Sequence, residues 1–169
     1  SLVGLGVAAR LLTRDIDPHR LAGLGALVGL VAFLAVLFAA PMASPTLFRI
    51  GVGLIGFGGG LFAVGTLVAA MQLDTGGLSG LALGAWGAVQ TTAVGCAIAL
   101  GGALSDTVAA LAASGALGST LSGPAVGYGA VYQLEIFLLL ATLVAIGPLV
   151  RYRREPRQEA CFGLAQFPG

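Results

Sequence analysis

Charged residues are scarce in this sequence. They make up 9% of its 169 residues, and lysine is absent. A soluble domain carries about a quarter of its residues as charged side chains. The composition therefore excludes a water-soluble protein, and nucleic-acid binding with it. One histidine and two cysteines, Cys96 and Cys161, are too few and too far apart to predict a metal centre or a disulfide.

Four long apolar stretches fill most of the chain instead. They cover residues 21–40, 50–71, 81–104 and 129–150, and they contain one charged residue, Glu135. A helix needs about 20 apolar residues to cross the roughly 30 Å hydrocarbon core of a bilayer, so each stretch is long enough to span it. The predicted fold class is all-α, a polytopic transmembrane helical bundle, with residues 21–150 as its four-span unit.

Arginines are concentrated on one side of these spans. Residues 1–20 hold three of the eight arginines, and the tail, residues 151–169, holds Arg151, Arg153, Arg154 and Arg157. Short segments rich in arginine stay in the cytoplasm, so both ends of the four-span unit, including the C-terminus, are predicted to be cytoplasmic. The basic tail is expected to lie on the lipid surface, where it contacts anionic headgroups.

The segments outside the spans add three expectations. We expect Leu2–Leu12 to be the last turns of a preceding membrane helix, because the arginines come after its apolar residues. In a signal peptide the positive charges come before the apolar residues. We therefore expect the C-terminal part of a longer protein. Arg10–Arg20 predicts a cytoplasmic linker. Ser105–Tyr128, which is rich in Ala, Gly and Ser, predicts a short helix at the outer surface that leads to a turn at Gly123-Pro124.

Glycines in the spans predict close helix packing. Residues 51–56 spell G-x-G-x-x-G, the pattern of a dinucleotide-binding loop. That loop requires a strand before it, whereas these residues open a long apolar run, so nucleotide binding is rejected. Small residues let membrane helices approach closely, and this role is predicted for Gly56, Gly60, Gly80 and Gly84.

Polar side chains inside the spans are the candidate functional residues, because burying them in a membrane is costly. Glu135 shares a helix face with Tyr132, and that face is expected to point into the bundle or toward a partner. Its carboxyl can carry a proton or make an interhelical hydrogen bond. Gln90, with Trp86 one turn before it, is expected to contact a partner across the bundle. These four residues are the candidates for ligand or substrate contact. No catalytic residue pair can be assembled, so an enzyme is not predicted.

Several segments, in the same order, resemble the PucC family of purple photosynthetic bacteria. They are FGGGLFAVGTL (57–67), GLALGAWGAVQTTAVGCAIALGGALSD (80–106), GPAVGYGAVYQLEIFLLLATLVAIGPL (123–149) and FGLAQFPG (162–169). The resemblance covers nearly the whole chain. It implies a branch of the major facilitator superfamily with twelve helices, of which these spans would be the last four. The superfamily's basic loop pattern, G-x-x-x-D-R-x-G-R-R, is altered here, with Arg10 in the position of the acid and Pro18 inside the pattern.

The resemblance implies a non-enzymatic factor that assists the assembly of light-harvesting antenna complexes. Its partners would be antenna polypeptides or a reaction-centre–antenna complex, in the photosynthetic intracytoplasmic part of the bacterial inner membrane. It would dock antenna helices, handle bacteriochlorophyll transiently as its one possible cofactor, or do both. Because no histidine lies in a span, the magnesium of that pigment would need Gln90, Glu135, a backbone carbonyl or water as its ligand.

Two other functions stay open. One is a transporter of a hydrophobic or pigment-like substrate, coupled to protons through Glu135. The substitution Glu135→Gln separates this function from assembly, since only proton-coupled transport should collapse. The other is a short structural subunit bound to a photosynthetic complex, for which the mass of the intact chain is the test.

Overall fold

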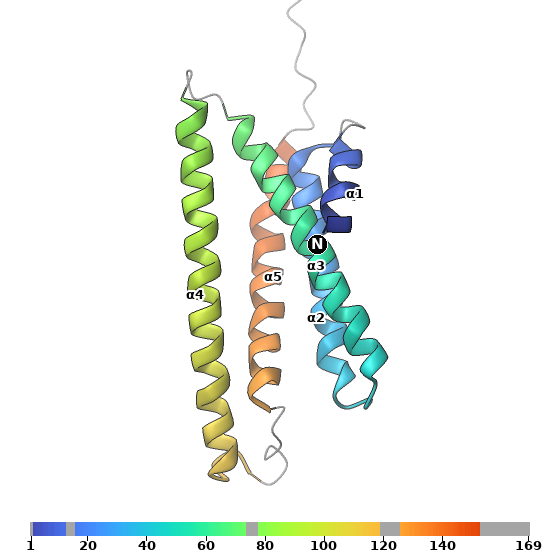
Figure 1. Cartoon of the computed structure of the whole chain (residues 1–169), viewed down its shortest axis with the longest axis vertical. Helices are drawn as coiled ribbons and strands as arrows, with labels where there is room; N and C mark the ends of the chain where they lie inside the picture. The colour runs from blue at the N-terminus through green and yellow to red at the C-terminus, as the bar shows by residue number, and fades with distance from the viewer. Residues whose placement is uncertain (1, 13–15, 74–77, 119–125, 153–169) are drawn as a thin grey trace, which may run out of the picture.

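The computed structural model describes residues 2–12, 16–73, 78–118 and 126–152, and these form helices without any strand. In order they are α1 (Leu2–Leu12), α2 (Pro18–Ala39), α3 (Pro45–Met71), α4 (Ser79–Ala113) and α5 (Val126–Tyr152) (Figure 1). The last four are long and apolar enough to cross a membrane. The predicted fold class, an all-α bundle of membrane-spanning helices, is confirmed, and the chain is a multi-pass membrane protein.

Local sequence signals start the first two long helices. Asp17 caps α2: its carboxylate accepts a hydrogen bond of 2.8 Å from the His19 amide. Pro18 follows in the first turn, where a proline has no hydrogen bond to break. Ser44 caps α3 in the same way, accepting a hydrogen bond of 3.3 Å from the Leu47 amide. Such caps satisfy amide groups that have no partner within the helix.

The prediction of a separate short helix after residue 104 is wrong. Residues 105–113 continue α4 to Ala113, because this alanine-rich run has high helix propensity and no residue that breaks the helix. The helix then ends in a turn that includes Gly115, at a φ of +75°. The predicted turn at Gly123-Pro124 and the tail from Arg153 onward lie outside the described residues.

The two ends of the bundle can be told apart in Figure 1. We call the end that carries the α2–α3 connection, residues 40–44, the lower end. The upper end carries the start of α2 and the end of α3. Helix α5 begins at the lower end and finishes at the upper end.

The α2–α3 contact is made through glycines spaced seven residues apart on α3. They are Gly51, Gly58 and Gly65, and all three are buried. A Cβ atom on Gly58 would lie 2.8 Å from the Gly25 carbonyl oxygen, and one on Gly65 would lie 2.7 Å from the Ala22 amide nitrogen. Real Cβ atoms do not come that close to backbone atoms. The two helices therefore touch backbone to backbone, and only glycine permits this contact.

A different face of α3 holds α1. A Cβ atom on Gly4 would lie 2.6 Å from the Phe57 carbonyl oxygen, and one on Gly60 would lie 3.3 Å from the Gly4 Cα. The small apolar core at this corner consists of Ala8, Leu21 and Leu61. Helix α3 is thus fixed from two directions, by α2 and by α1.

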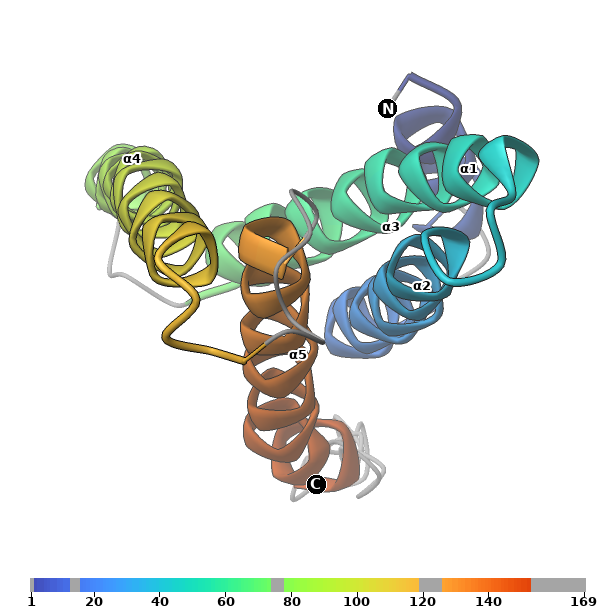
Figure 2. The ribbon, with the colours of Figure 1, turned by 90° about the horizontal axis from the view of Figure 1, so that it is seen from below.

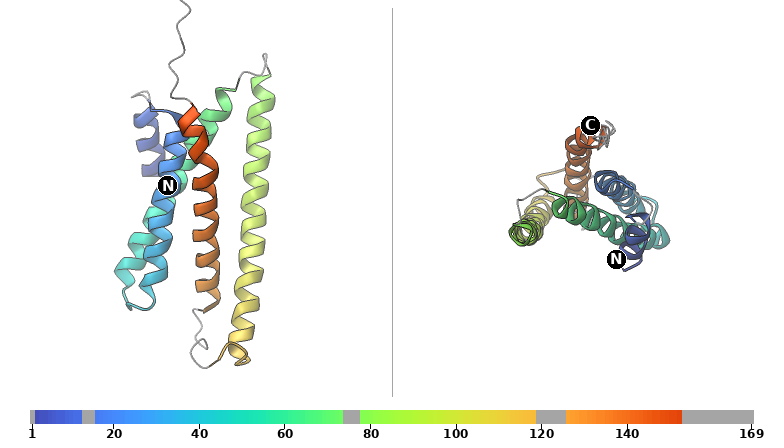
Figure 3. Two further views of the ribbon diagram at one scale, coloured as in Figure 1. Left: turned by 180° about the vertical axis from the view of Figure 1, so that it is seen from behind. Right: turned by 90° about the horizontal axis from the view of Figure 1, so that it is seen from above.

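Helices α5 and α4 complete the bundle on the other side. Figures 2 and 3 show α5 between α2 and α4, and α4 farthest from α1 and α2. Helix α4 meets α5 where a Cβ atom on Gly127 would lie 2.5 Å from the Ser105 carbonyl oxygen. Farther up, the α4 residues 91–100 are all exposed in this chain.

The backbone contact at Gly58 predicts the effect of a single methyl group. Gly58→Ala should lower the free energy of unfolding by about 1–3 kcal/mol, because the added Cβ forces α2 and α3 apart. The measurement is denaturation of the purified full-length protein in a mild detergent.

Gly59→Ala is the matched control, because a Cβ atom there meets nothing within 4 Å. Its stability should stay the same or rise slightly, since alanine favours the helix over glycine. Equal losses in the two variants would contradict the backbone contact.

Candidate functional site

Three cavities follow one another along the line where α2, α3 and α5 meet. The lower cavity has a volume of about 580 Å³, the middle one about 280 Å³ and the upper one about 410 Å³. Tyr132 on α5 lines the lower cavity and Phe33 on α2 lines the middle one, and their ring centroids are 6.1 Å apart, so the two cavities are neighbours. We call the three cavities together the α5 groove.

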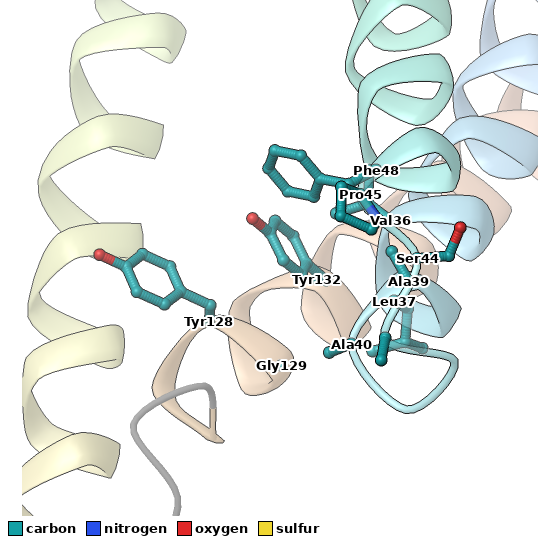
Figure 4. A pocket seen from close by; sticks show the side chains of 11 residues that line it. Val36, Leu37, Ala39, Ala40, Ser44, Pro45, Phe48, Tyr128, Gly129 and Tyr132 are labelled. Atoms are coloured by element: carbon teal, nitrogen blue, oxygen red, sulfur yellow. The ribbon is translucent and has the colours of Figure 1, made fainter.

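The lower cavity has an aromatic mouth. Its lining includes Phe48 from α3 and Tyr128 and Tyr132 from α5, with small residues of the α2–α3 connection opposite (Figure 4). Tyr128 is 61% exposed, and Tyr132 is half-buried. Within the part of the chain that the structure describes, neither tyrosine hydroxyl has a hydrogen-bond partner. The mouth therefore offers flat apolar surfaces and two free hydroxyl groups.

The middle cavity contains Glu135, the one charged residue of the four apolar stretches. Its lining is apolar or glycine except for Glu135 and Thr142, both on α5. The Thr142 hydroxyl donates a hydrogen bond of 2.8 Å to the Leu138 carbonyl, so its donor is satisfied within the helix. Among the described residues, the Glu135 carboxyl has no hydrogen-bond or ion-pair partner. It is the group in this cavity that is available to a ligand or a proton.

In the upper cavity, two of the polar lining residues already have partners. The His19 Nδ1 lies 3.2 Å from the Asp17 carboxylate. The Thr66 hydroxyl donates a hydrogen bond of 2.9 Å to the Phe62 carbonyl. The groove therefore has its free polar groups in the lower and middle cavities, while its upper part is apolar with satisfied polar groups at the edge.

The four residues predicted to contact a ligand fall into two separate places. Tyr132 and Glu135 line the α5 groove, whereas Trp86 and Gln90 are half-buried on α4 and line none of its three cavities.

The register between α4 and α5 explains this separation. Gly101 lies opposite Val131, and Ser105 lies opposite Gly127. Continuing this antiparallel register places Gln90 level with Thr142. That level is about 10 Å from Glu135 along the helix axis, at 1.5 Å per residue. One small ligand group cannot be bound by both Gln90 and Glu135 in this arrangement.

The glycines predicted to pack helices also differ from one another. Gly60 lies against α1, and Gly56 is half-buried. At Gly80 and Gly84 a Cβ atom would meet nothing within 4 Å, so neither packs against another described helix of this chain. A packing role for these two stays a prediction about a partner helix.

The four glycines that the sequence predicts to pack do not include Gly25, Gly51, Gly58 and Gly65, although Gly51 and Gly58 lie in the glycine-rich stretch that predicts close packing. The spacing of seven residues on α3 was the signal that could have found three of them. In the tail, the side chain of Arg151 is not described, and Arg153, Arg154 and Arg157 lie outside the described residues.

The fold and the groove define a multi-pass helical membrane protein with an apolar site between three helices. A sequence profile of the PUCC protein family matches residues 1–154. The chain belongs to this family.

Three relatives show how much of a family member the chain represents. The chain is 49% identical over 173 residues to the "uncharacterized protein in puhA-bchM intergenic region" of Rhodobacter capsulatus, covering 99% of this chain and 36% of the relative. It is 46% identical over 152 residues to protein PucC of Cereibacter sphaeroides, covering 89% of this chain and 32% of that protein. It is 50% identical over 108 residues to protein PucC of Rhodovulum sulfidophilum, covering 64% of this chain and 24% of that protein. The chain thus spans about a third or less of these relatives. No solved structure matches it.

Proposed function

We propose that the chain is part of a membrane protein that assists the assembly of light-harvesting antenna complexes in purple bacteria without catalysing a reaction. The observation that carries this proposal is the family match over residues 1–154, together with relatives named PucC. The partners are antenna polypeptides or a reaction-centre–antenna complex, and the location is the photosynthetic intracytoplasmic membrane. The described helices offer two surfaces for such work, a face of α4 and the α5 groove.

The first surface is a glycine face on α4, which we propose as a docking site for an antenna helix. It comprises Gly80, Gly84, Gly87, Gly95 and Gly102. These spacings place the glycines on one side of the helix. At each of them a Cβ atom would meet nothing within 4 Å. Helices pack closely in membranes through such faces, because small residues let two backbones approach.

Filling this face should impair assembly. In a strain that lacks the native gene, Gly95→Leu in the full-length protein should reduce the near-infrared absorbance of the antenna complex severalfold, because the side chain holds a partner helix away. Membrane spectra, normalised to the amount of the protein, give the measurement.

Ala93→Leu is the control, since Ala93 is also exposed and lies about 160° around the helix from Gly95. It should leave the antenna absorbance unchanged. If both variants behave like the unmodified protein, the glycine face does not dock a partner.

The second surface is the α5 groove, which we propose as the place where bacteriochlorophyll is handled. The residues fit this pigment in two respects. Glu135 supplies an unpartnered oxygen of the kind that magnesium accepts, in a cavity with otherwise apolar walls. Tyr132 and Phe33 supply ring surfaces beside it. When bound, the pigment would supply light absorption, and the protein would supply a water-poor site that holds it.

A proton-coupled transporter is the second candidate function, and the unpartnered carboxyl in the middle cavity is the observation that favours it. An intramembrane carboxyl is a common proton carrier. Under our proposal Glu135→Gln should preserve most of the antenna absorbance, because an amide keeps both the size and an oxygen ligand. Complementation of the deletion strain gives the measurement. Complete loss of antenna, with normal protein levels, would favour the transporter.

We also propose that the upper end of the bundle faces the cytoplasm, following the distribution of the arginines. A green fluorescent protein fused to the C-terminus should fluoresce, and alkaline phosphatase at the same position should be inactive. The control is a fusion truncated after Ala43, in the α2–α3 connection, which should give the reverse pattern. A periplasmic reporter signal from the C-terminus would contradict this orientation.

A further inference from the structure

We propose that the α5 groove binds one molecule with a hydrogen-bonding ring system, which carries no negative charge, at the lower end and a single long hydrocarbon tail that runs toward the upper end. This inference deepens the pigment-handling part of the proposed function and rests on it for the choice of probe. It adds the orientation of the ligand, the residues that hold each part of it, and the chemical class that the groove accepts.

The dimensions of the groove indicate an elongated ligand. The lower cavity reaches Ala39 on α2, and the upper cavity reaches Ala22. These positions are about 25 Å apart along a helix that rises 1.5 Å per residue. The middle cavity between them has a volume of about 280 Å³. A helix with side chains is about 10–12 Å wide, so this passage suits a single hydrocarbon chain better than a partner helix.

The distribution of free polar groups orients the ligand. Three residues of α5 have a hydroxyl or carboxyl without a described partner, namely Tyr128, Tyr132 and Glu135; they lie within about two turns and line the lower and middle cavities. Above this level, the hydroxyls of Thr142 and Thr66 donate to backbone carbonyls. Hydroxyl and carboxyl groups that lack a partner are available to hydrogen-bond a ligand. A ligand that binds with its polar ring at the lower end supplies those partners, and its apolar tail lies where none is needed.

The charges of the lining argue against a negatively charged ring system. Among the described residues, no arginine lines the lower cavity. Besides the two tyrosines, its polar lining residue is Ser44, which already caps α3. A phosphate headgroup would therefore find no cation there, although cationic side chains are what phosphates require. Aromatic rings instead favour a flat conjugated system, which can stack on Tyr132 and Phe48. A ring with keto or ester oxygens, attached to an isoprenoid tail, has this chemistry.

Two glycines of α3 provide a test of the part of the groove that is proposed to hold the ligand's hydrocarbon tail. Gly59 lines the middle cavity, Gly53 lines none of the three, and a Cβ atom at either meets nothing within 4 Å. Gly59→Leu should fill the passage without a backbone clash, while Gly53→Leu adds the same side chain elsewhere on the helix. Binding to full-length protein in lipid nanodiscs is measured separately with bacteriochlorophyll, ubiquinone and phytol. Thermal unfolding of each variant checks that it is folded.

The proposal predicts saturable binding, one molecule per protein, of at least one of the two ring compounds. Gly59→Leu should weaken it more than tenfold, and Gly53→Leu should leave it unchanged. Tyr128→Phe and Tyr132→Phe should each weaken it about fivefold, the effect of one net hydrogen bond. Phytol, which is a tail without a ring, should bind weakly, and its binding should not respond to the tyrosine changes. The two ring compounds distinguish a magnesium pigment from a quinone as the source of the ligand.

Three results would overturn the proposal. They are no saturable binding of either ring compound, equal binding by the two leucine variants, and no effect of removing both tyrosine hydroxyls. The antenna absorbance in cells tests the assembly function separately from ligand binding. If Gly59→Leu loses ligand binding but keeps the antenna absorbance in cells, the groove binds the ligand as proposed and assembly does not depend on it.

Discussion

The backbone contact between α2 and α3 is the constraint on which the rest of the structure depends. Gly51, Gly58 and Gly65 bring the two helices so close that a methyl group at Gly58 would lie 2.8 Å from a carbonyl oxygen. Apolar side chains alone give little drive for helices to associate in a membrane, because lipid tails are as apolar as leucine. Close contact between glycine faces supplies dispersion and backbone interactions that lipid cannot replace. The α2–α3 pair is therefore the rigid element of this chain.

The groove follows from that contact. Where α3 presents glycines toward α2, few side chains remain to fill the space beside α5. Gly25, Gly29, Gly58 and Gly59 all line the middle cavity, together with Phe33, Ile55 and Phe62 from the same two helices. The opposite wall is α5, which carries Tyr128, Tyr132 and Glu135 at helical spacing. The same glycines thus fix the helix pair and leave room for a ligand.

Much of the fold could be predicted from the sequence, because span length and apolar character decide it directly. The predicted stretches fall within the four long helices, with the first extending one residue beyond α2, and the all-α fold is confirmed. The prediction ended the third span too early because Ser105–Ala113 lacks the hydrophobicity of a span, although its high helix propensity and the lack of a residue that ends a helix let α4 continue. Tyr132 and Glu135 could be placed on one face from their spacing alone.

What the sequence could not show is which helix each face meets. Gln90 and Glu135 are both polar residues in spans, yet the antiparallel register of α4 and α5 separates them by about 10 Å. Gly80 and Gly60 both occur in small-residue patterns, yet Gly60 meets α1, whereas a Cβ atom on Gly80 would meet nothing within 4 Å among the described residues. Such differences depend on tertiary contacts, which carry no local signature.

An experimental structure of the full-length protein in a lipid nanodisc tests the central claim most directly. It should show α2 and α3 in backbone contact, with Gly51, Gly58 and Gly65 facing α2 and Gly60 facing α1, and an open groove beside α5. A structure in which α3 is rotated so that those three glycines face lipid, or in which another helix separates α2 from α3, would contradict this account.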